Sequence, residues 1–448
     1  MIERLKKQLA SSATQQRLER LADGAPAAAP LSLRFELGQG ERDWLELLPQ
    51  SLPFWYRARA ERCEFRLGIG HALQIASGGR HRFAALDNAF AGLRRNWRHE
   101  DGALAFAGFA FAPGDEGPLP NALLTVPGIL LESLGGGCTA TLSIPAGRRA
   151  QAIAEWGQWL EQLPRRRLTQ PVELLPRPAE MLVDQAWIAR CRSALRTIAS
   201  GRLDKLVLAR SRQLETRHEI AAAALLEALL AQQPDSLIYA FGNGRQVFLG
   251  ATPERLIRLQ RGRLDADALA GTAWAAEPEL AGAKNRHEQS LVVRAVGAAL
   301  APLAGSPLVI GGAHEQSAGH LRHLRSRIRA QALAGTTLFD LLAALHPTPA
   351  VGGYPTAAAL AWLAEHGEQR HGWYSGGIGY LDQDGDGEFS VALRSALLSG
   401  RTALLQAGAG IVTGSDPGSE LAETEAKFDT IMGAFATAGQ GTTRVTGT

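Results

Sequence analysis

Short strand patterns joined by tight turns restrict how this sequence can fold more than any other feature. Leu237–Leu259 carries two apolar runs around Asn243-Gly244, and an Asn-Gly pair between such runs favours a β-hairpin. Trp373–Leu398 predicts two further strands about a turn, and Thr402–Val412 predicts another strand. Helical patterns lie among these strands, at 186–201, 221–233 and 284–300. The sequence therefore predicts an α/β fold of the α+β type, with antiparallel sheets covered by helices.

The first part of the chain gives weaker signals. Leu104–Pro113 predicts a buried strand whose glycine is closely approached by another part of the chain. Pro164–Pro178 is rich in proline and arginine, lacks a clean period, and predicts a linker or a surface crossing.

The composition argues against a nucleic-acid partner. The 448 residues are 46% hydrophobic, enough for a large core or for two to three domains, and the formal charge is only +3. The arginine patch at Arg322, Arg325, Arg327 and Arg329 is too short to indicate nucleic acid and predicts a solvated helix face. Aromatic and basic residues do not alternate as they do in single-strand binders.

Cysteine usage and hydropathy bear on location. Cys63, Cys138 and Cys191 lie far apart and form no CxxC pattern, which argues against a disulfide framework or a zinc site and fits a reducing compartment. Residues 1–12 lack the apolar core of a signal peptide, and no run of about 18 apolar residues is present. We therefore expect a cytoplasmic protein without a membrane partner.

An acidic helix start within Gly414–Met432 is the first candidate site. Asp416 or Ser419 can cap the helix, and Glu420 and Glu423 then share one face. In the simplest interpretation these carboxylates are solvated and interact favourably with the helix dipole. The alternative is a cation, or a substrate complex of a hard metal ion, between the two carboxylates.

Three more charged residues are ambiguous when taken one at a time. Lys205 stands at the mouth of the apolar run LVLA, where it is either solvated or, if buried, a base with a lowered pKa. Glu254 follows Ala-Thr-Pro and is either an ordinary turn charge or a site residue. Glu288 precedes an apolar helical stripe and is either a surface charge or a ligand.

Two further segments imitate binding motifs. Gly408, Gly410 and Gly414 have a GxGxxxG spacing, which is weak as a dinucleotide site; the backbone there either approaches an anion or packs closely on another strand. The segment DQDGDGE at 382–388 imitates a calcium loop. Leu393 stands where that loop needs a bidentate Glu, so a hairpin turn is favoured.

Eight blocks occur together in an order that resembles the chorismate-utilising enzymes, and more narrowly the isochorismate synthases. They read LDKLVLAR, ATPERLIRL, LAGT, KNRHEQSLV, HPTPAVGGYP, WYSGGIGYLD, VALRSALL, and AGAGIV with SELAETEAKF. The resemblance covers residues 181–437, the chorismate-binding catalytic region. It implies two stacked, mainly antiparallel sheets flanked by helices, in which residues 1–180 form a less recognisable part of the same fold. Residues 438–448 are expected to form a flexible tail.

The resemblance also implies a Mg²⁺ site at the acidic helix. Glu423 and Glu288 would hold the ion with Glu420 beside it, since a hard cation takes oxygen ligands. Asn285 stands where relatives often carry an acid, so that outer position is weaker here. Lys427, one turn after Glu423, would pair with the acidic cluster or with a substrate carboxylate.

The reaction that the resemblance implies adds water at carbon 2 of chorismate as the 4-hydroxyl leaves, so one group must accept a proton and another must give one. Lys205 would be the base, with a pKa lowered by burial, and Glu254 the acid, which must keep its proton near neutral pH. The family's substrate contacts map onto Arg394, Tyr374, His323, Gly408 and Gly410 near the enolpyruvyl side chain, and onto Gly271 and Thr272 at the ring carboxylate.

Single residues separate the branches of the family. Anthranilate synthases typically carry Gln where Lys205 stands, and aminodeoxychorismate synthases carry a lysine where Ala270 stands. Salicylate synthases, which go on to eliminate pyruvate, tend to have a PAVTASG loop where this chain reads PTPAVGG with Ala350. These differences favour an isochorismate synthase of menaquinone or siderophore biosynthesis, with a salicylate synthase as the alternative.

A non-catalytic chorismate-binding subunit is the alternative from another class. Loss of the base, the acid or the metal ligands would mark such a protein, and none of them is lost here. We expect a monomer that takes chorismate as its substrate and needs no glutaminase subunit.

Overall fold

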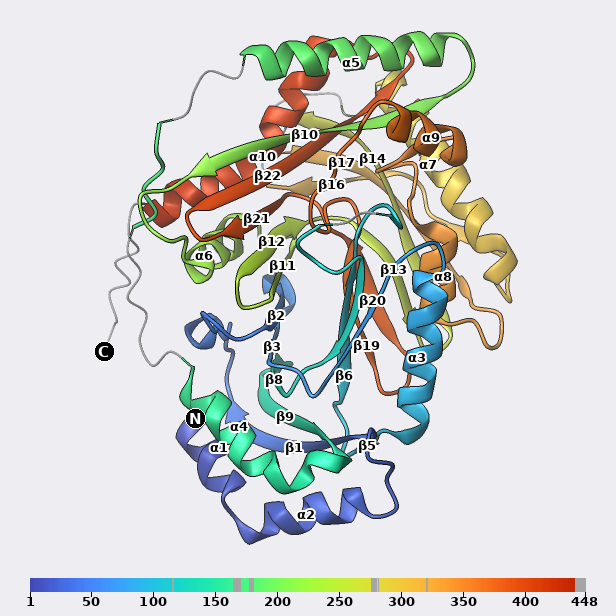
Figure 1. The fold of residues 1–448 in the computed structure, drawn as a ribbon. Coiled ribbons are helices and arrows are strands. Elements are labelled where there is room, and N and C mark those ends of the chain that lie inside the picture. The colour runs from blue at the N-terminus through green and yellow to red at the C-terminus, as the bar shows by residue number, and fades with distance from the viewer. Residues whose placement is uncertain are drawn as a thin grey trace.

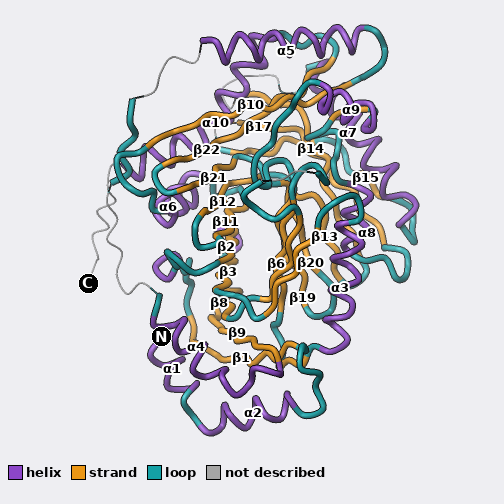
Figure 2. Tube along the Cα trace, viewed as in Figure 1, coloured by secondary structure: helices purple, strands orange, loops and turns teal. Residues whose placement is uncertain are grey.

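Two large β-sheets stacked against each other occupy the centre of the molecule, with helices along their outer sides and ends (Figure 1). The computed structural model describes residues 1–114, 117–163, 171–176, 181–274, 280, 282–319 and 321–439. Figure 2 shows the strands gathered inside and the helices outside. Within these residues the strands pair antiparallel except for one short pair, which confirms the predicted sheet architecture.

The first sheet has 12 strands, in the order β18 (Gly353–Tyr354), β10 (Lys205–Glu215), β22 (Thr402–Val412), β21 (Ser395–Ser399), β12 (Gln246–Thr252), β11 (Leu237–Gly242), β2 (Phe54–Arg59), β3 (Glu64–Ile69), β8 (Ile129–Leu134), β9 (Gly137–Pro145), β1 (Pro30–Gln39) and β5 (Arg98–His99).

The second sheet has ten strands. Their order is β15 (Val309–Ile310), β17 (Leu321–Gln331), β14 (Arg263–Trp274), β13 (Arg255–Gln260), β20 (Gly387–Val391), β19 (Gly377–Asp382), β6 (Leu104–Phe109), β7 (Ala122–Val126) and β4 (Leu73–Ser77), with β16 (His314–Ala318) paired to β17. The helices of the described residues are α1 (Ile2–Leu9), α2 (Ser12–Ala22), α3 (Arg82–Asn96), α4 (Ala152–Glu161), α5 (Met181–Ala199), α6 (Ala222–Gln232), α7 (Ala283–Leu300), α8 (Leu338–Leu345), α9 (Thr356–Glu365) and α10 (Pro417–Gly439).

The N-terminal strands are built into both sheets. β2 pairs with β11 and β6 pairs with β19, so residues before and after the expected boundary share each sheet. The division at residue 180 stays a prediction, because 164–170 and 177–180 lie outside the described residues. At the other end α10 continues to Gly439, and the rest of the expected tail also lies outside them.

Three apolar layers join the sheets and helices. Between the sheets, Trp55 stacks on Trp373 with 5.5 Å between ring centroids, and Phe241 lies 4.8 Å from Trp373. Outside, the first sheet packs mainly on α1, α2, α4, α6 and α10, and the second mainly on α3, α7 and α8. A Cβ on Gly108 would lie 2.2 Å from the Trp373 ring, which confirms the close approach predicted for strand β6.

The arginine patch is not on a helix, and this prediction was wrong. Arg325, Arg327 and Arg329 lie on β17, where their spacing of two puts them on one face of a strand. Arg325 pairs with Asp267 at 2.7 Å and Arg327 with Asp265 at 3.0 Å, both on the neighbouring β14. Cross-strand carboxylates therefore neutralise two of these arginines.

The predicted hairpin turns are confirmed. β11 and β12 pair about Asn243-Gly244, and the segment that imitates a calcium loop joins β19 to β20. Its first carboxylate, Asp382, accepts backbone hydrogen bonds from Asp384 at 2.9 Å and Asp386 at 3.0 Å, as in an ordinary turn. Among the described helices none is both long and apolar enough to cross a membrane.

Candidate active site

Residues from both sheets and from two helices line one cleft. Its free volume is about 60 Å³, room for about two water molecules and below the ~300–1,000 Å³ of most ligand pockets. Side chains must therefore move apart to admit a metabolite. Ten residues singled out in the sequence contribute to its lining: Glu254, Gly271, Thr272, Glu288, His323, Arg394, Gly408, Gly410, Glu423 and Lys427.

Lys205, at the start of β10, is buried rather than solvated. Its side chain is 1% exposed, and its Nζ lies 2.8 Å from the Glu288 carboxylate on α7, which is itself buried. Opposite them on β22, a Cβ at Gly410 would lie 2.5 Å from the Glu288 carboxylate and 3.1 Å from Lys205 Cε. Glycine at 410 therefore leaves the space in which this ion pair forms.

Glu254 stands between β12 and β13 and is 4% exposed. Burial raises the pKa of its carboxyl to about 8, and the nearby charge of Lys205 opposes this rise only in part. Within the described part of the chain, no hydrogen bond or ion pair reaches the Glu254 carboxylate. Its backbone N–H donates to Thr252 Oγ1 at 3.2 Å, and its backbone carbonyl accepts from the Val391 N–H at 3.0 Å. Glu254 is thus a carboxyl group that keeps its proton at neutral pH.

His323 holds Arg394 at the far side of the cleft. Arg394 donates to His323 Nε2 at 3.1 Å, which leaves His323 Nδ1 as the donor to the Gly271 carbonyl, also at 3.1 Å. Burial and the positive charge of Arg394 lower the pKa of His323 to about 3, so the ring is neutral. Arg394 adopts a φ of +49°, a strained conformation that is frequent at functional sites.

Two backbone features bring main-chain groups to this side of the cleft. Gly271 forms a bulge between β14 and β17 with a φ of +69°, and a Cβ there would lie 3.1 Å from Asn285. Gly408 on β22 accepts a 2.7 Å hydrogen bond from Lys427, and a Cβ at Gly408 would lie 2.9 Å from the Tyr374 hydroxyl. The glycines of β22 therefore serve close packing of the site's side chains.

In the acidic first turn of α10, Glu420 is buried and Glu423 is half-buried, with 20% of its side chain exposed, so the simplest interpretation of two solvated glutamates was wrong. Glu420 is 1% exposed and pairs with Lys284 of α7, while Glu423 pairs with Lys427 at 2.5 Å. Burial and the negative charge of Glu423 raise the pKa of Glu420. Burial alone would also raise the pKa of Glu423, but Lys427 and Lys284 outweigh it and lower this pKa.

Each of the three glutamates that the sequence analysis assigned to a metal site forms an ion pair with a lysine. Among the described residues no three acidic, histidine or cysteine side chains are arranged as a metal-binding group. The donor set nevertheless fits Mg²⁺ chemically, because buried carboxylate oxygens are the ligands that a hard divalent ion takes, and Glu420 and Glu423 repel each other without a cation. In the closed cleft Lys205, Lys284 and Lys427 each occupy one oxygen of these carboxylates.

Sequence reasoning missed Lys284 and Tyr239. Lys284 is the first residue of the block KNRHEQSLV, and the sequence analysis did not assign it to the site. Its position one turn before Glu288 on the same helix could have indicated that it lies near the site. Tyr239 donates to the Leu393 carbonyl at 2.9 Å and so supports the backbone that carries Arg394. Nothing in the local sequence around Tyr239 indicates this contact, since it joins two strands far apart in the chain.

The chain is similar to known proteins across both sheets. A family model described as chorismate binding enzyme matches residues 43–436. Isochorismate synthase MenF of Bacillus subtilis is 30% identical over 352 residues, covering 75% of each protein. A protein of Mycobacterium tuberculosis named putative isochorismate synthase MenF is 38% identical over 317 residues, covering 66% of this chain and 82% of that one.

Two further similarities differ in coverage. The salicylate biosynthesis isochorismate synthase of Pseudomonas aeruginosa is 37% identical over 290 residues. The match covers 62% of this chain and 61% of that protein. The solved structure of the menaquinone-specific isochorismate synthase MenF from Escherichia coli aligns with a TM-score of 0.79 at 27% identity, over 95% of this chain and 100% of that one.

Proposed function

This chain belongs to the chorismate-binding enzyme family, and we propose that it is an isochorismate synthase, an isomerase that converts chorismate to isochorismate. The observation that carries the proposal is a pair of complementary groups at the cleft, since Glu254 lines it and Lys205 is buried beside it, paired with the lining residue Glu288. A buried lysine, Lys205, lies near a buried carboxyl, Glu254, whose pKa of about 8 keeps it protonated at neutral pH. Relatives that match most of this chain carry the name isochorismate synthase.

These two groups account for the two proton transfers of the reaction. Lys205 accepts a proton from the water that adds at carbon 2, and Glu254 donates a proton to the 4-hydroxyl as it leaves as water. The substrate formula is unchanged, and proton exchange with solvent resets both groups. In the closed cleft Lys205 Nζ lies 2.8 Å from the Glu288 carboxylate, so Lys205 has to leave this contact to reach the attacking water.

The other site residues bind and orient the substrate. Arg394, fixed by neutral His323, offers a planar donor pair to the enolpyruvyl carboxylate, and Tyr374 and Gly408 hold the same group. Gly271 and Thr272 hold the ring carboxylate, and Gly410 and Lys427 complete the pocket. Glu288 and Glu423, with Glu420 beside them, would hold Mg²⁺, which when bound supplies a compensating charge for the carboxylates of protein and substrate.

A product assay tests the proposal. Purified protein is given chorismate with and without Mg²⁺ and ammonia, and the products are separated by liquid chromatography. We expect Mg²⁺-dependent isochorismate in equilibrium with chorismate, independent of ammonia, and its loss in Lys205→Ala with Lys7→Ala as a surface control. Salicylate plus pyruvate would instead assign the chain to the salicylate synthases, and absence of turnover would favour a binding subunit.

The remaining parts of the proposal concern partners and location. Cys63, Cys138 and Cys191 carry free thiols, which supports the proposed cytoplasmic location. We expect the enzyme to act as a monomer without a glutaminase subunit, in menaquinone or siderophore biosynthesis. Light scattering of the purified protein checks the monomer, and the ammonia arm of the assay checks the absence of amide transfer.

A further inference from the structure

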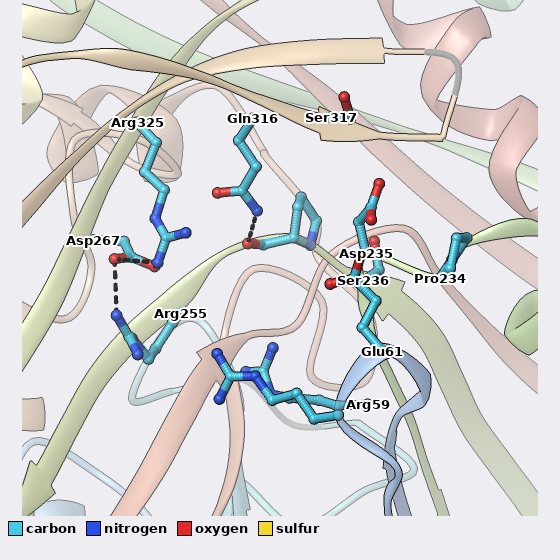
Figure 3. A pocket seen from close by; sticks show the side chains of 12 residues that line it. Arg59, Glu61, Pro234, Asp235, Ser236, Arg255, Asp267, Gln316, Ser317 and Arg325 are labelled. Carbon is cyan, nitrogen blue, oxygen red and sulfur yellow. Dashed lines mark hydrogen bonds and ion pairs between the residues drawn. The ribbon is translucent and has the colours of Figure 1, made fainter.

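The side chain of Arg370 differs in what it binds from two arginines on β13 and β17. Figure 3 shows these two, Arg255 and Arg325, which both donate to the carboxylate of Asp267. The side chain of Arg370 is 2% exposed, and both of its terminal nitrogens donate to main-chain carbonyl groups. A guanidinium group that bridges two carbonyls holds two backbone segments at a fixed distance, because its planar donors point in fixed directions.

The two carbonyls belong to β10 and to the loop 346–352, which joins α8 to β18. Nη1 of Arg370 donates to the Val351 carbonyl at 2.7 Å, and Nη2 donates to the Val207 carbonyl at 3.0 Å. The N–H of Val207 in turn donates to the Gly352 carbonyl at 3.0 Å. Since the other edge of β10 pairs with β22, Arg370 fastens the loop along the outer edge of β10.

Glu368 extends the same contact along this edge. Its side chain is 4% exposed, and its carboxylate accepts from the Ala209 N–H at 2.7 Å and lies 3.4 Å from Nε of Arg370. The short strand β18 pairs with β10 at Lys205 and Leu206. Beyond these two residues, the side chains of Glu368 and Arg370 bind the main-chain groups that a neighbouring strand would bind.

These contacts lie next to groups that the proposed reaction uses. Val207 lines the cleft, and so does Ala350 of the loop. Lys205 lies two residues before Val207 and therefore on the same face of β10. A Cβ on Gly353 would lie 2.5 Å from the Lys205 carbonyl, so the chain that follows the loop packs directly against the backbone of the base. The position of Lys205 and of this wall of the cleft thus depends on how the loop is fastened.

We propose that Arg370 is a positioning residue for the isomerase reaction, and that it holds β10 and the loop so that Lys205 and Ala350 keep their places at the cleft. It acts through these two backbone segments, since its terminal nitrogens are occupied by their carbonyls. The inference rests on the proposed function, because it gives Arg370 a role in the chemistry of Lys205.

Steady-state kinetics of isochorismate formation test this role in the full-length protein. Arg370→Met keeps much of the side-chain volume without its donors, and Arg370→Lys keeps the charge but has a single terminal nitrogen. Arg190→Met is the matched control, because it removes another arginine of the Glu368 carboxylate, one that lies on α5 and is 30% exposed. Urea unfolding measures the stability of each variant, and Arg370→Lys carries the test if Arg370→Met does not fold.

We expect Arg370→Met to lower kcat about 10²-fold, the effect of misplacing a reacting group by about 1 Å, with a much smaller change in KM for chorismate. Arg370→Lys should recover part of this loss. Arg190→Met should keep kcat close to that of the wild type even where it lowers stability, because the two carbonyls keep their donor.

Three results would overturn the role of Arg370. They are an unchanged kcat in Arg370→Met, an equal loss of kcat in Arg190→Met, and a raised KM with unchanged kcat, which would indicate an effect on substrate binding alone. Failure of the proposed function is distinguishable, since the wild type itself would then form no isochorismate, and the role of Arg370 would fail with it.

Discussion

Glu254 and Glu388 are buried to the same extent, 4% exposed, and yet hold opposite charge states. Glu388, on β20 between the sheets, accepts from Arg57 and Arg59 and lies 3.9 Å from Arg255. Burial acts to raise the pKa of Glu388, but the three arginines outweigh it and lower this pKa well below its usual range. For Glu254 burial prevails, and its pKa rises to about 8.

The difference shows that burial alone does not decide what a carboxylate does. Glu388 is ionised and buried. It lies on β20 of the second sheet and accepts hydrogen bonds from arginines on β2 of the first sheet, so it links the two sheets. Glu254 faces a cleft without a hydrogen bond to its carboxyl group, and Lys205 supplies only part of the compensating charge. A carboxyl group in that state is suited to give a proton and not to stabilise the fold. Replacing Glu254 should therefore lower turnover, whereas replacing Glu388 should lower the stability of the fold.

Replacing Glu254 is the variant expected to affect turnover most. Glu254→Gln keeps a neutral side chain of the same shape but cannot donate the proton, so kcat should fall about 10²–10⁴-fold. The melting temperature should not fall, because the native residue is already neutral. Steady-state kinetics and calorimetric melting measure both effects. Normal turnover in this variant would remove Glu254 from the reaction.

Replacing Glu388 should give the reverse pattern. Glu388→Gln leaves the buried Arg57 and the partly exposed Arg59 without their carboxylate, and breaking a buried ion pair costs about 3–5 kcal/mol of unfolding free energy. Urea unfolding measures the loss, and turnover of the folded protein should stay close to that of the wild type. A stable but inactive Glu388→Gln protein would contradict the contrast between the two glutamates.

The third prediction concerns the carboxylates of α10. Glu423→Gln removes one negative oxygen donor from the proposed metal site, so the apparent Mg²⁺ affinity should fall at least about tenfold. A Mg²⁺ titration of the activity, paired with calorimetric binding, measures it. Glu425→Gln, two residues away and paired with Arg212, is the matched control. An unchanged titration in Glu423→Gln would exclude this residue from metal binding.

The smallest expected effect comes from Lys284. This lysine neutralises Glu420 in the closed cleft, and its side chain is 37% exposed. Lys284→Met removes a competitor of the metal ion, so Mg²⁺ should bind more tightly, by up to about fivefold for an ion pair that is partly screened by solvent. Calorimetric Mg²⁺ binding measures this without turnover. Weaker Mg²⁺ binding in Lys284→Met would show that the lysine supports the metal site and does not compete with it.

The family resemblance, and not any local pattern, grouped the candidate site residues. Lys205, Glu254 and Glu288 each had an ordinary interpretation, and only their occurrence together in ordered blocks implied that they belong to one site. That Lys205 pairs with Glu288 followed from neither residue alone, since one begins a strand and the other lies on a helix more than 80 positions later. Such a contact depends on how sheet and helix pack, which local patterns do not encode.

The errors have a common physical origin. The arginines of β17 were assigned to a helix face because their cross-strand partners, Asp265 and Asp267, lie some 60 residues earlier in the sequence. The membership of the N-terminal strands in the same fold was expected correctly, but only from the family resemblance and not from a local pattern. Turns such as Asn243-Gly244 were predicted correctly because they are determined by their own residues.

Direct titration of Glu254 tests the central claim, that this carboxyl group is protonated at neutral pH although Glu388 is not. Protein labelled with ¹³C at the glutamate carboxyl carbon is followed by NMR across pH, and Glu254→Gln assigns the signal. The account predicts a carboxyl signal that titrates near pH 8 and is absent from the variant, so that the acid form required for proton donation is present below about pH 8 and lost above it. A signal that titrates near the ordinary value of 4.5 would contradict it.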